Sequence, residues 1–138
     1  MIPMVKKLSL LLCLLFLTTY LVQAETIKVP NEGTYVGDVK NGKPHGQGTL
    51  KNEDGETYVG SWKEGLKDGI GTLTYIDGSK YAGAFKDNKI HGYGSFTSSS
   101  GSNYTGEYKE GKMDGQGTYT YPDGKKITGK WANDSPAK

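Results

Sequence analysis

The stretch YVGSWKEGLKDGIGTLTYIDGSK, residues 58–80, decides the fold of this chain because its pattern recurs. Aligned on the leading tyrosine, the sequence repeats every 23 residues. The complete copies are residues 35–57, 58–80, 81–103 and 104–126, and a partial copy covers residues 127–131. A fixed period of roughly 20 to 50 residues predicts a repeat architecture, so each local motif is interpreted within the repeat.

Glycine follows the same period. Apart from Gly33, every glycine lies at one of five repeat positions, numbered from the leading tyrosine. Position 3 is glycine in all copies, at Gly37, Gly60, Gly83, Gly106 and Gly129. Positions 12, 14 and 21 are glycine in each complete copy; position 8 is glycine except at Asn88, a residue type that also tolerates a left-handed backbone. Glycines that recur in every copy indicate a structural role and argue against a single phosphate-binding loop.

The repeat predicts β-hairpins. Large or small side chains alternate with polar ones at the strand period, and Pro122-Asp123-Gly124 is typical of a three-residue hairpin turn. This turn length places position 16 opposite position 1 of the next copy, and glycine 14 opposite glycine 3. The large residues at positions 1, 5 and 16 then share one face, where cross-strand pairs stabilise the sheet.

These units resemble the MORN repeat, which runs Tyr-x-Gly-x-aromatic, then Gly-x-Gly-x-Leu, then Asp-Gly. The resemblance covers residues 35–131 and departs from the pattern at Val39 and at residues 98–100. It implies an all-β fold, an elongated antiparallel meander of repeated β-hairpins. It implies no catalytic residues.

Residues 1–24 have the layout of a secretory signal peptide. Lys6 and Lys7 precede an apolar run over residues 8–22, and Val22-Gln23-Ala24 provides small residues before a cleavage point. The run is shorter than the roughly 20 residues of a spanning helix, so we expect a cleaved helical signal peptide; a retained anchor is the alternative. The expected mature protein starts at Glu25 and is secreted or periplasmic, with a lead-in at 25–34 and a tail at 132–138.

Charge narrows the classes of partner. Without Lys6 and Lys7 the 17 lysines fall to 15, which balance the 15 acidic residues, and the chain has no arginine. A neutral chain argues against a nucleic-acid binder, which needs a basic surface. Position 6 is lysine in each complete copy, at Lys40, Lys63, Lys86 and Lys109, and this row could attract an anionic membrane. Acidic residues often follow these lysines directly, which favours a solubilising polar face instead.

Metal binding and catalysis find little support. Position 11 carries His45, Asp68, His91 and Asp114, which we place in the long loop of each hairpin. Equivalent residues of neighbouring copies should lie about 10 Å apart, whereas metal ligands lie about 2 Å from the ion. Neither histidine has a nucleophile at a fixed spacing. We therefore expect a protein without catalytic residues, metal or cofactor.

Two functions remain. The first is a protein-interaction or scaffold module, because repeat arrays present long surfaces to protein partners. The second is a glycan- or cell-wall-binding module that stacks sugars on the aromatic face; phospholipid binding is a weaker third option. The candidate partner contacts are Trp131, Trp62 and Tyr108. We expect Phe85 and Tyr108 in the core and Trp131 partly exposed on an edge strand, while the oligomeric state stays open.

Overall fold

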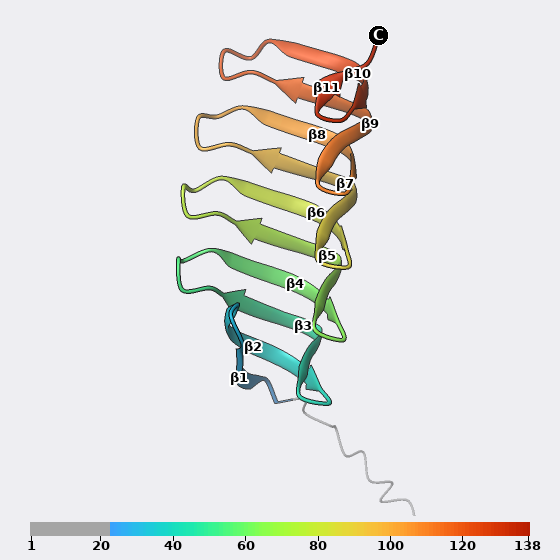
Figure 1. Cartoon of the computed structure of the whole chain (residues 1–138). Coiled ribbons are helices and arrows are strands. Elements are labelled where there is room, and N and C mark those ends of the chain that lie inside the picture. Colours follow the sequence, from blue (N-terminus) through green and yellow to red (C-terminus); the bar gives the residue numbers. More distant parts are fainter. Residues whose placement is uncertain (1–22) are drawn as a thin grey trace, which may run out of the picture.

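The chain folds into one antiparallel β-sheet. A computed structural model describes residues 23–138, so the predicted signal peptide lies almost wholly outside the described residues. Eleven strands follow one another in chain order, each paired with the next (Figure 1). They are β1 (Glu25–Val29), β2 (Gly33–Lys40), β3 (Lys43–Lys51), β4 (Thr57–Lys63), β5 (Leu66–Thr74), β6 (Lys80–Lys86), β7 (Lys89–Thr97), β8 (Asn103–Lys109), β9 (Lys112–Thr120), β10 (Lys126–Ala132) and β11 (Ser135–Pro136).

The predicted all-β meander is confirmed. Residues 25–34, expected as a lead-in, contribute β1, and residues 132–138, expected as a tail, contribute β11. Over residues 23–138 the structure has no helix long and apolar enough to cross a membrane.

The predicted pairing between repeats is also confirmed. Leu50 lies opposite Tyr58, and Tyr119 lies opposite Ile127. The turn after β5 has the expected three-residue form, because Tyr75 N donates to Ser79 O at 2.9 Å and Gly78 N donates to Tyr75 O at 3.0 Å. Position 21 is glycine because the turn needs a left-handed residue there; Gly78 has a φ of 86°.

The turn inside each repeat is shorter than the sequence suggested. Glu64 and Gly65, at positions 7 and 8, have φ values of 51° and 85°, as a two-residue type I′ turn requires. Asn88 takes the same conformation at position 8, with a φ of 72°. The second strand therefore begins at position 9. Position 11 lies in this strand, and its placement in a long loop was wrong.

A row of glycines crosses nine consecutive strands, where each glycine is paired with the next. The row is Gly37, Gly48, Gly60, Gly71, Gly83, Gly94, Gly106, Gly117 and Gly129. A β-carbon on Gly94 would overlap the Tyr81 side chain, and one on Gly83 would lie 2.6 Å from Tyr81 Oη. The tyrosine rings at position 1 thus occupy the space that the glycines leave free.

The rings at positions 1 and 5 form one continuous core. Neighbouring rings meet edge to face, a favourable arrangement, with Tyr58 to Trp62 centroids 5.0 Å apart and Tyr81 to Phe85 centroids 5.2 Å apart. Together with Leu50, the buried residues of this core are the rings of Tyr35, Tyr58, Trp62, Tyr81, Phe85, Tyr104, Tyr108 and Trp131. The predicted core positions of Phe85 and Tyr108 are confirmed.

Trp131 is a correction, because only 4% of its surface is exposed. The chain turns at Asn133 and Asp134, and Pro136 of β11 comes to lie opposite Trp131. The indole Nε1 donates to Gly117 O at 3.2 Å, and the ring meets Tyr104 edge to face at 5.3 Å. The expectation of an exposed edge overlooked this final turn.

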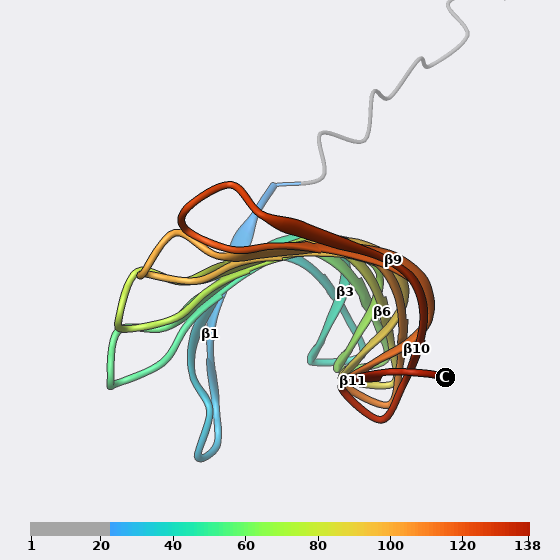
Figure 2. The same cartoon turned by 90° about the horizontal axis from the view of Figure 1, so that it is seen from above.

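The sheet bends into a trough (Figure 2). Between the pairs Gly37–Gly48 and Val39–Pro44, residues 45–47 of β3 lie opposite the single residue Asp38. The same shift recurs in the three following complete repeats. Such bulges bend a strand and increase its twist, and Gly46 at this one has a φ of 69°. The recurrence at one repeat position gives successive hairpins the same bend.

Candidate binding groove

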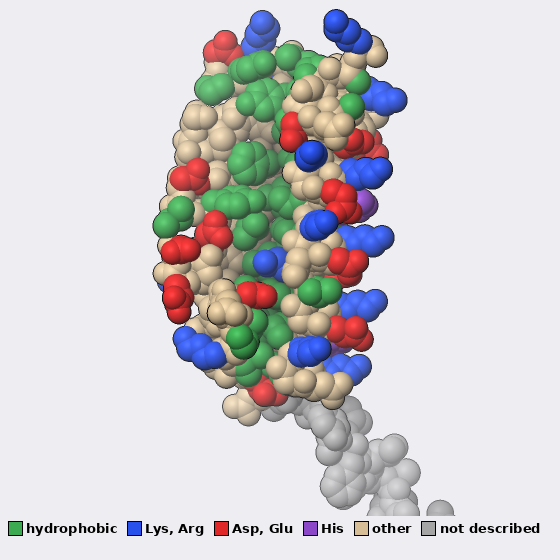
Figure 3. Space-filling model, in the orientation of Figure 1, with side chains coloured by type: hydrophobic (Ala, Val, Ile, Leu, Met, Phe, Trp, Pro, Cys, Tyr) green, Lys and Arg blue, Asp and Glu red, His purple; other side chains and the backbone are tan. Residues whose placement is uncertain are grey.

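The aromatic face lines the inside of the trough. Looking into its opening, hydrophobic side chains form a stripe along the length of the molecule, between two rims that carry the charged residues (Figure 3). The stripe contains the partly buried side chains that pack against the core: Ile27, Val29, Val39, Leu73, Ile90, Phe96, Met113, Tyr119 and Ile127. These side chains pack over the buried rings and supply most of the apolar surface of the groove.

A pocket of about 300 Å³ deepens the groove over β7, β8 and β9. Its floor is formed by Tyr104 and Tyr108, and its apolar walls by partly buried side chains. The walls come from Tyr75, Ile90, Phe96, Met113 and Tyr119. Ser102 and Asp134 add polar groups to the lining. An apolar pocket with a few polar groups is the usual form of a binding site.

The hydroxyl of Tyr108 is the unusual polar group of this pocket. In the described residues it is the one buried side-chain oxygen or nitrogen without a hydrogen-bond partner. The position 1 tyrosines, by contrast, donate to backbone carbonyls: Tyr81 Oη lies 2.9 Å from Ala84 O. Burial raises the pKa of Tyr108 far above its ordinary value, with a smaller contribution from Tyr81. A buried hydroxyl without a hydrogen-bond partner lowers the stability of the fold.

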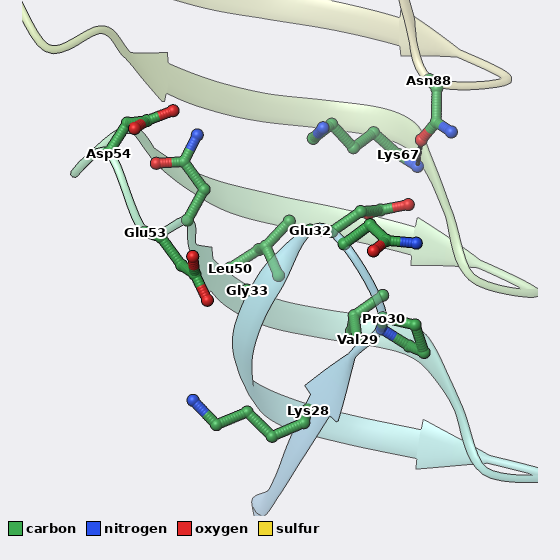
Figure 4. A pocket seen from close by; sticks show the side chains of 12 residues that line it. Lys28, Val29, Pro30, Glu32, Gly33, Leu50, Glu53, Asp54, Lys67 and Asn88 are labelled. Atoms are coloured by element: carbon green, nitrogen blue, oxygen red, sulfur yellow. Dashed lines mark hydrogen bonds between the residues drawn. The ribbon is translucent and has the colours of Figure 1, made fainter.

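The groove has a different character at the other end. The turn between β1 and β2 reaches over the opening and encloses a space of about 700 Å³ with Leu50 and residues 52–54 (Figure 4). Lys67 also lines this space, and its ammonium lies 5.6 Å from the Tyr58 ring centre and 5.8 Å from that of Trp62. A cation over aromatic rings is a favourable contact. Lys67 therefore packs over the ring of Trp62, as Ile90 packs over Phe85 and Met113 over Tyr108 in the following repeats.

The lysine row at position 6 is exposed, as expected of a solubilising face. Acidic residues interrupt the charge along the same rim: Lys89 Nζ lies 2.6 Å from Glu110 Oε2, with both side chains more than half exposed. The hydrogen bond raises the pKa of Lys89 and lowers that of Glu110. The mixed rim does not form the basic surface that an anionic membrane attracts.

Position 11 has a structural role in joining repeats. His45 Nδ1 accepts a hydrogen bond from Glu64 N at 3.3 Å, and Asp68 Oδ2 accepts one from Asp87 N at 3.4 Å. His91 and Asp114 make the same contact with the turns that follow them. Each side chain thus holds the turn of the next repeat. In residues 23–138, no three His, Cys, Asp or Glu residues lie together in a way that could hold a metal.

The proposed partner residues are buried in the core beneath the surface of the groove. Trp62 and Tyr108 are exposed by 3% and 7%, and Trp131 is equally buried, so all three support the groove from beneath. Sequence reasoning missed the wall residues Ile90 and Met113, at position 10. The available signal was their place two residues after the turn at positions 7 and 8, which puts them directly opposite position 5.

A protein-family model described as MORN repeat matches residues 35–57, 58–80, 81–103 and 104–126. Its four matches coincide with the four complete repeats and cover two thirds of the chain. No curated protein matches the chain.

Proposed function

Since the chain belongs to the MORN repeat family, whose repeats are generally protein- or membrane-interacting modules, we propose that it is a secreted, non-enzymatic protein-interaction module. Its groove takes an apolar segment of a protein partner. The carrying observation is the pocket beside Tyr108, where Ile90, Phe96 and Met113 present apolar surface to solvent within a concave face. Apolar side chains gathered in a hollow, between polar rims, are typical of a protein-binding surface.

The shape of the groove favours an extended segment over a globular surface. The trough is long and open at one side, and its apolar stripe runs across the strands (Figures 2 and 3). The Tyr108 hydroxyl is buried beneath this stripe, so a bound segment would contact the apolar side chains above it. The partner thus needs apolar side chains along one face.

Glycan binding is the less favoured alternative. Sugars stack on open aromatic faces, but Trp62 and Tyr108 are buried, and their edge-to-face contacts already use these ring surfaces. Membrane binding is disfavoured by the mixed charge of the rim, where Lys89 pairs with Glu110.

Secretion is supported by the layout of residues 1–24 in the sequence. Intact-mass measurement of the exported protein tests it, with a start at Glu25 as the expected result. A chain that still carries Cys13 would show that the segment stays attached.

The groove is tested by replacing Met113 with a photo-crosslinking residue and irradiating the cells that export the protein. Adducts should contain a second protein and should map to an apolar segment. Ile70, which is 67% exposed and lies outside the groove lining, is the matched control. Equal crosslinking from both sites would contradict a groove-specific partner. Binding on a glycan array that Phe96→Ala abolishes would favour the sugar-binding alternative.

A further inference from the structure

Strand β1 is the second half of a repeat whose first half is absent from the described residues. Ile27 lies opposite Tyr35 just as Leu50 lies opposite Tyr58, so β1 occupies positions 14–18. The turn that follows has the same length and the same hydrogen bond, since Glu32 N donates to Val29 O at 3.1 Å as Gly55 N does to Asn52 O at 3.2 Å. Its left-handed residues are Asn31 and Gly33, whereas the later turn has Gly55 at position 21. The outer edge of β1 therefore has the register that normally meets a first strand.

Strand β10, at the opposite end of the sheet, is the first half of a repeat (Figure 1). Its inner edge pairs with β9 over residues 126–131. On its outer edge β11 pairs only with Trp131 and Ala132. Lys130 O also accepts a hydrogen bond from Ala137 N at 2.8 Å. Within residues 23–138, the outer edge of residues 126–129 pairs with no strand, and it has the register that normally meets positions 14–17.

Both ends depart from the repeat in a way that makes them compatible. In complete repeats position 14 is glycine because the tyrosine at position 1 fills the space above it, as Tyr104 does over Gly117. β1 carries Glu25 at position 14, which a tyrosine at position 1 would exclude. β10 carries Ile127 at position 1, and this shorter side chain leaves the room that Glu25 needs.

We propose that β1 of one copy of this chain pairs antiparallel with β10 of a second copy and completes a repeat between them. Ile27 would lie opposite Ile127, Thr26 opposite Thr128, and Glu25 opposite Gly129. The outer face gains a further threonine pair, continuing a row in which Thr118 and Thr128 hydroxyl oxygens lie 2.9 Å apart. Each junction leaves one β1 and one β10 free, so the assembly is an open, head-to-tail series.

One contact would destabilise this junction and make its strength depend on salt. Lys28 would lie opposite Lys126, and like charges that face one another across strands repel. The chain accepts such pairs elsewhere, since Lys86 lies opposite Lys89 and Lys109 opposite Lys112. Salt screens exposed charges, so head-to-tail association should strengthen as ionic strength rises.

The first test is analytical ultracentrifugation of the purified exported protein over a range of concentrations and salt. The expected result is an open series of species whose average mass rises with both. Ile127→Tyr restores the residue of the complete repeats, so the fold is retained while the ring excludes Glu25, and species larger than one chain should be lost. Adding Glu25→Gly should restore them. A wild-type protein that remains one chain throughout, or an Ile127→Tyr variant that assembles as before, overturns the proposal.

A disulfide test fixes the register. The double variant Thr26→Cys, Thr128→Cys should form a ladder of covalent oligomers when oxidised, while each single variant should yield none. A covalent dimer from Thr128→Cys alone would mean that β10 pairs with β10, which contradicts the head-to-tail arrangement. Disulfides require α-carbons roughly 4.4–6.8 Å apart, a distance that directly opposed strand residues satisfy.

Discussion

The side chain of Tyr81 fills the space above Gly94, its neighbour on the second strand of the same hairpin. The hydroxyl then reaches back to Ala84 O of its own strand, at 2.9 Å. Tyr58 has the same relationship to Gly71 and to Ser61 O. Each tyrosine thus links the two strands of one hairpin, and the glycine makes this contact sterically available.

This contact predicts a strong penalty for side chains on the glycine row. In Gly83→Val the new β-carbon would lie 2.6 Å from both Tyr81 Oη and Tyr93 O, so the strands must move apart. Overpacking typically costs about 1–3 kcal/mol of unfolding free energy, even though valine favours strands. Urea denaturation measures the loss. Lys86→Ala, an exposed change on the same strand, is the control, and an equal loss from both would contradict the packing described for the row.

Alkaline pH should unfold the protein through its core tyrosines. Burial raises the pKa of Tyr58 and Tyr81 to about 12 from an ordinary value near 10. Above pH 10 the unfolded chain releases these protons while the folded chain retains them, so stability falls as the pH rises from about 10 to about 12. Below pH 10 this contribution is fully present. Denaturation curves at several pH values should show the decline, and Tyr81→Phe should make it shallower; an unchanged slope in that variant would contradict the assignment.

Trp131 should behave as a core residue. We expect Trp131→Ala and Phe85→Ala each to cost about 3–5 kcal/mol, because both remove a buried ring. A Trp62→Phe background isolates the fluorescence of Trp131, which should resist quenching by acrylamide. Ready quenching in that background would show that β11 does not cover the indole in solution.

The turn at Asn88 offers a graded prediction. Its backbone is left-handed, its N donates to Lys67 O, and its Oδ1 accepts from Lys67 N, both at 2.9 Å. Asn88→Gly keeps the conformation and loses only the side-chain hydrogen bond, whereas Asn88→Ala also introduces strain of about 1–2 kcal/mol. Thermal melts should therefore rank wild type above Asn88→Gly, and Asn88→Gly above Asn88→Ala. The reverse order of the two variants would exclude backbone strain as the dominant effect.

The pairing between repeats could be predicted from sequence because it depends on a local count. The spacing from Leu50 to Tyr58 across a three-residue turn fixes which residues meet, and the glycine pairs follow from it. The turn within a repeat was harder to recognise, since Glu64 takes a left-handed conformation that its residue type does not favour. Its stability comes from the preceding repeat, where His45 accepts a hydrogen bond from Glu64 N.

The groove could not be predicted because it depends on how the two strands within a repeat pair and on the bend of the sheet, and neither was predicted from the sequence. Without the turn at positions 7 and 8, Met113 could not be placed opposite Tyr108, nor Pro136 opposite Trp131. The bend arises at bulges such as residues 45–47, which contain the left-handed glycine of position 12, and that recurring glycine was not interpreted as a bulge from the sequence. The buried face could therefore be predicted, but the surface above it could not.

Because each strand pairs only with those before and after it in the chain, the 23-residue unit can be multiplied without inventing a new contact. A duplication or loss of one unit in the gene would change the trough by one hairpin, about 10 Å, and leave every junction of the same kind. The number of repeats can thus change during evolution at a small structural cost. Selection on such a lineage would act on the length of the trough, matching it to whatever the trough must span.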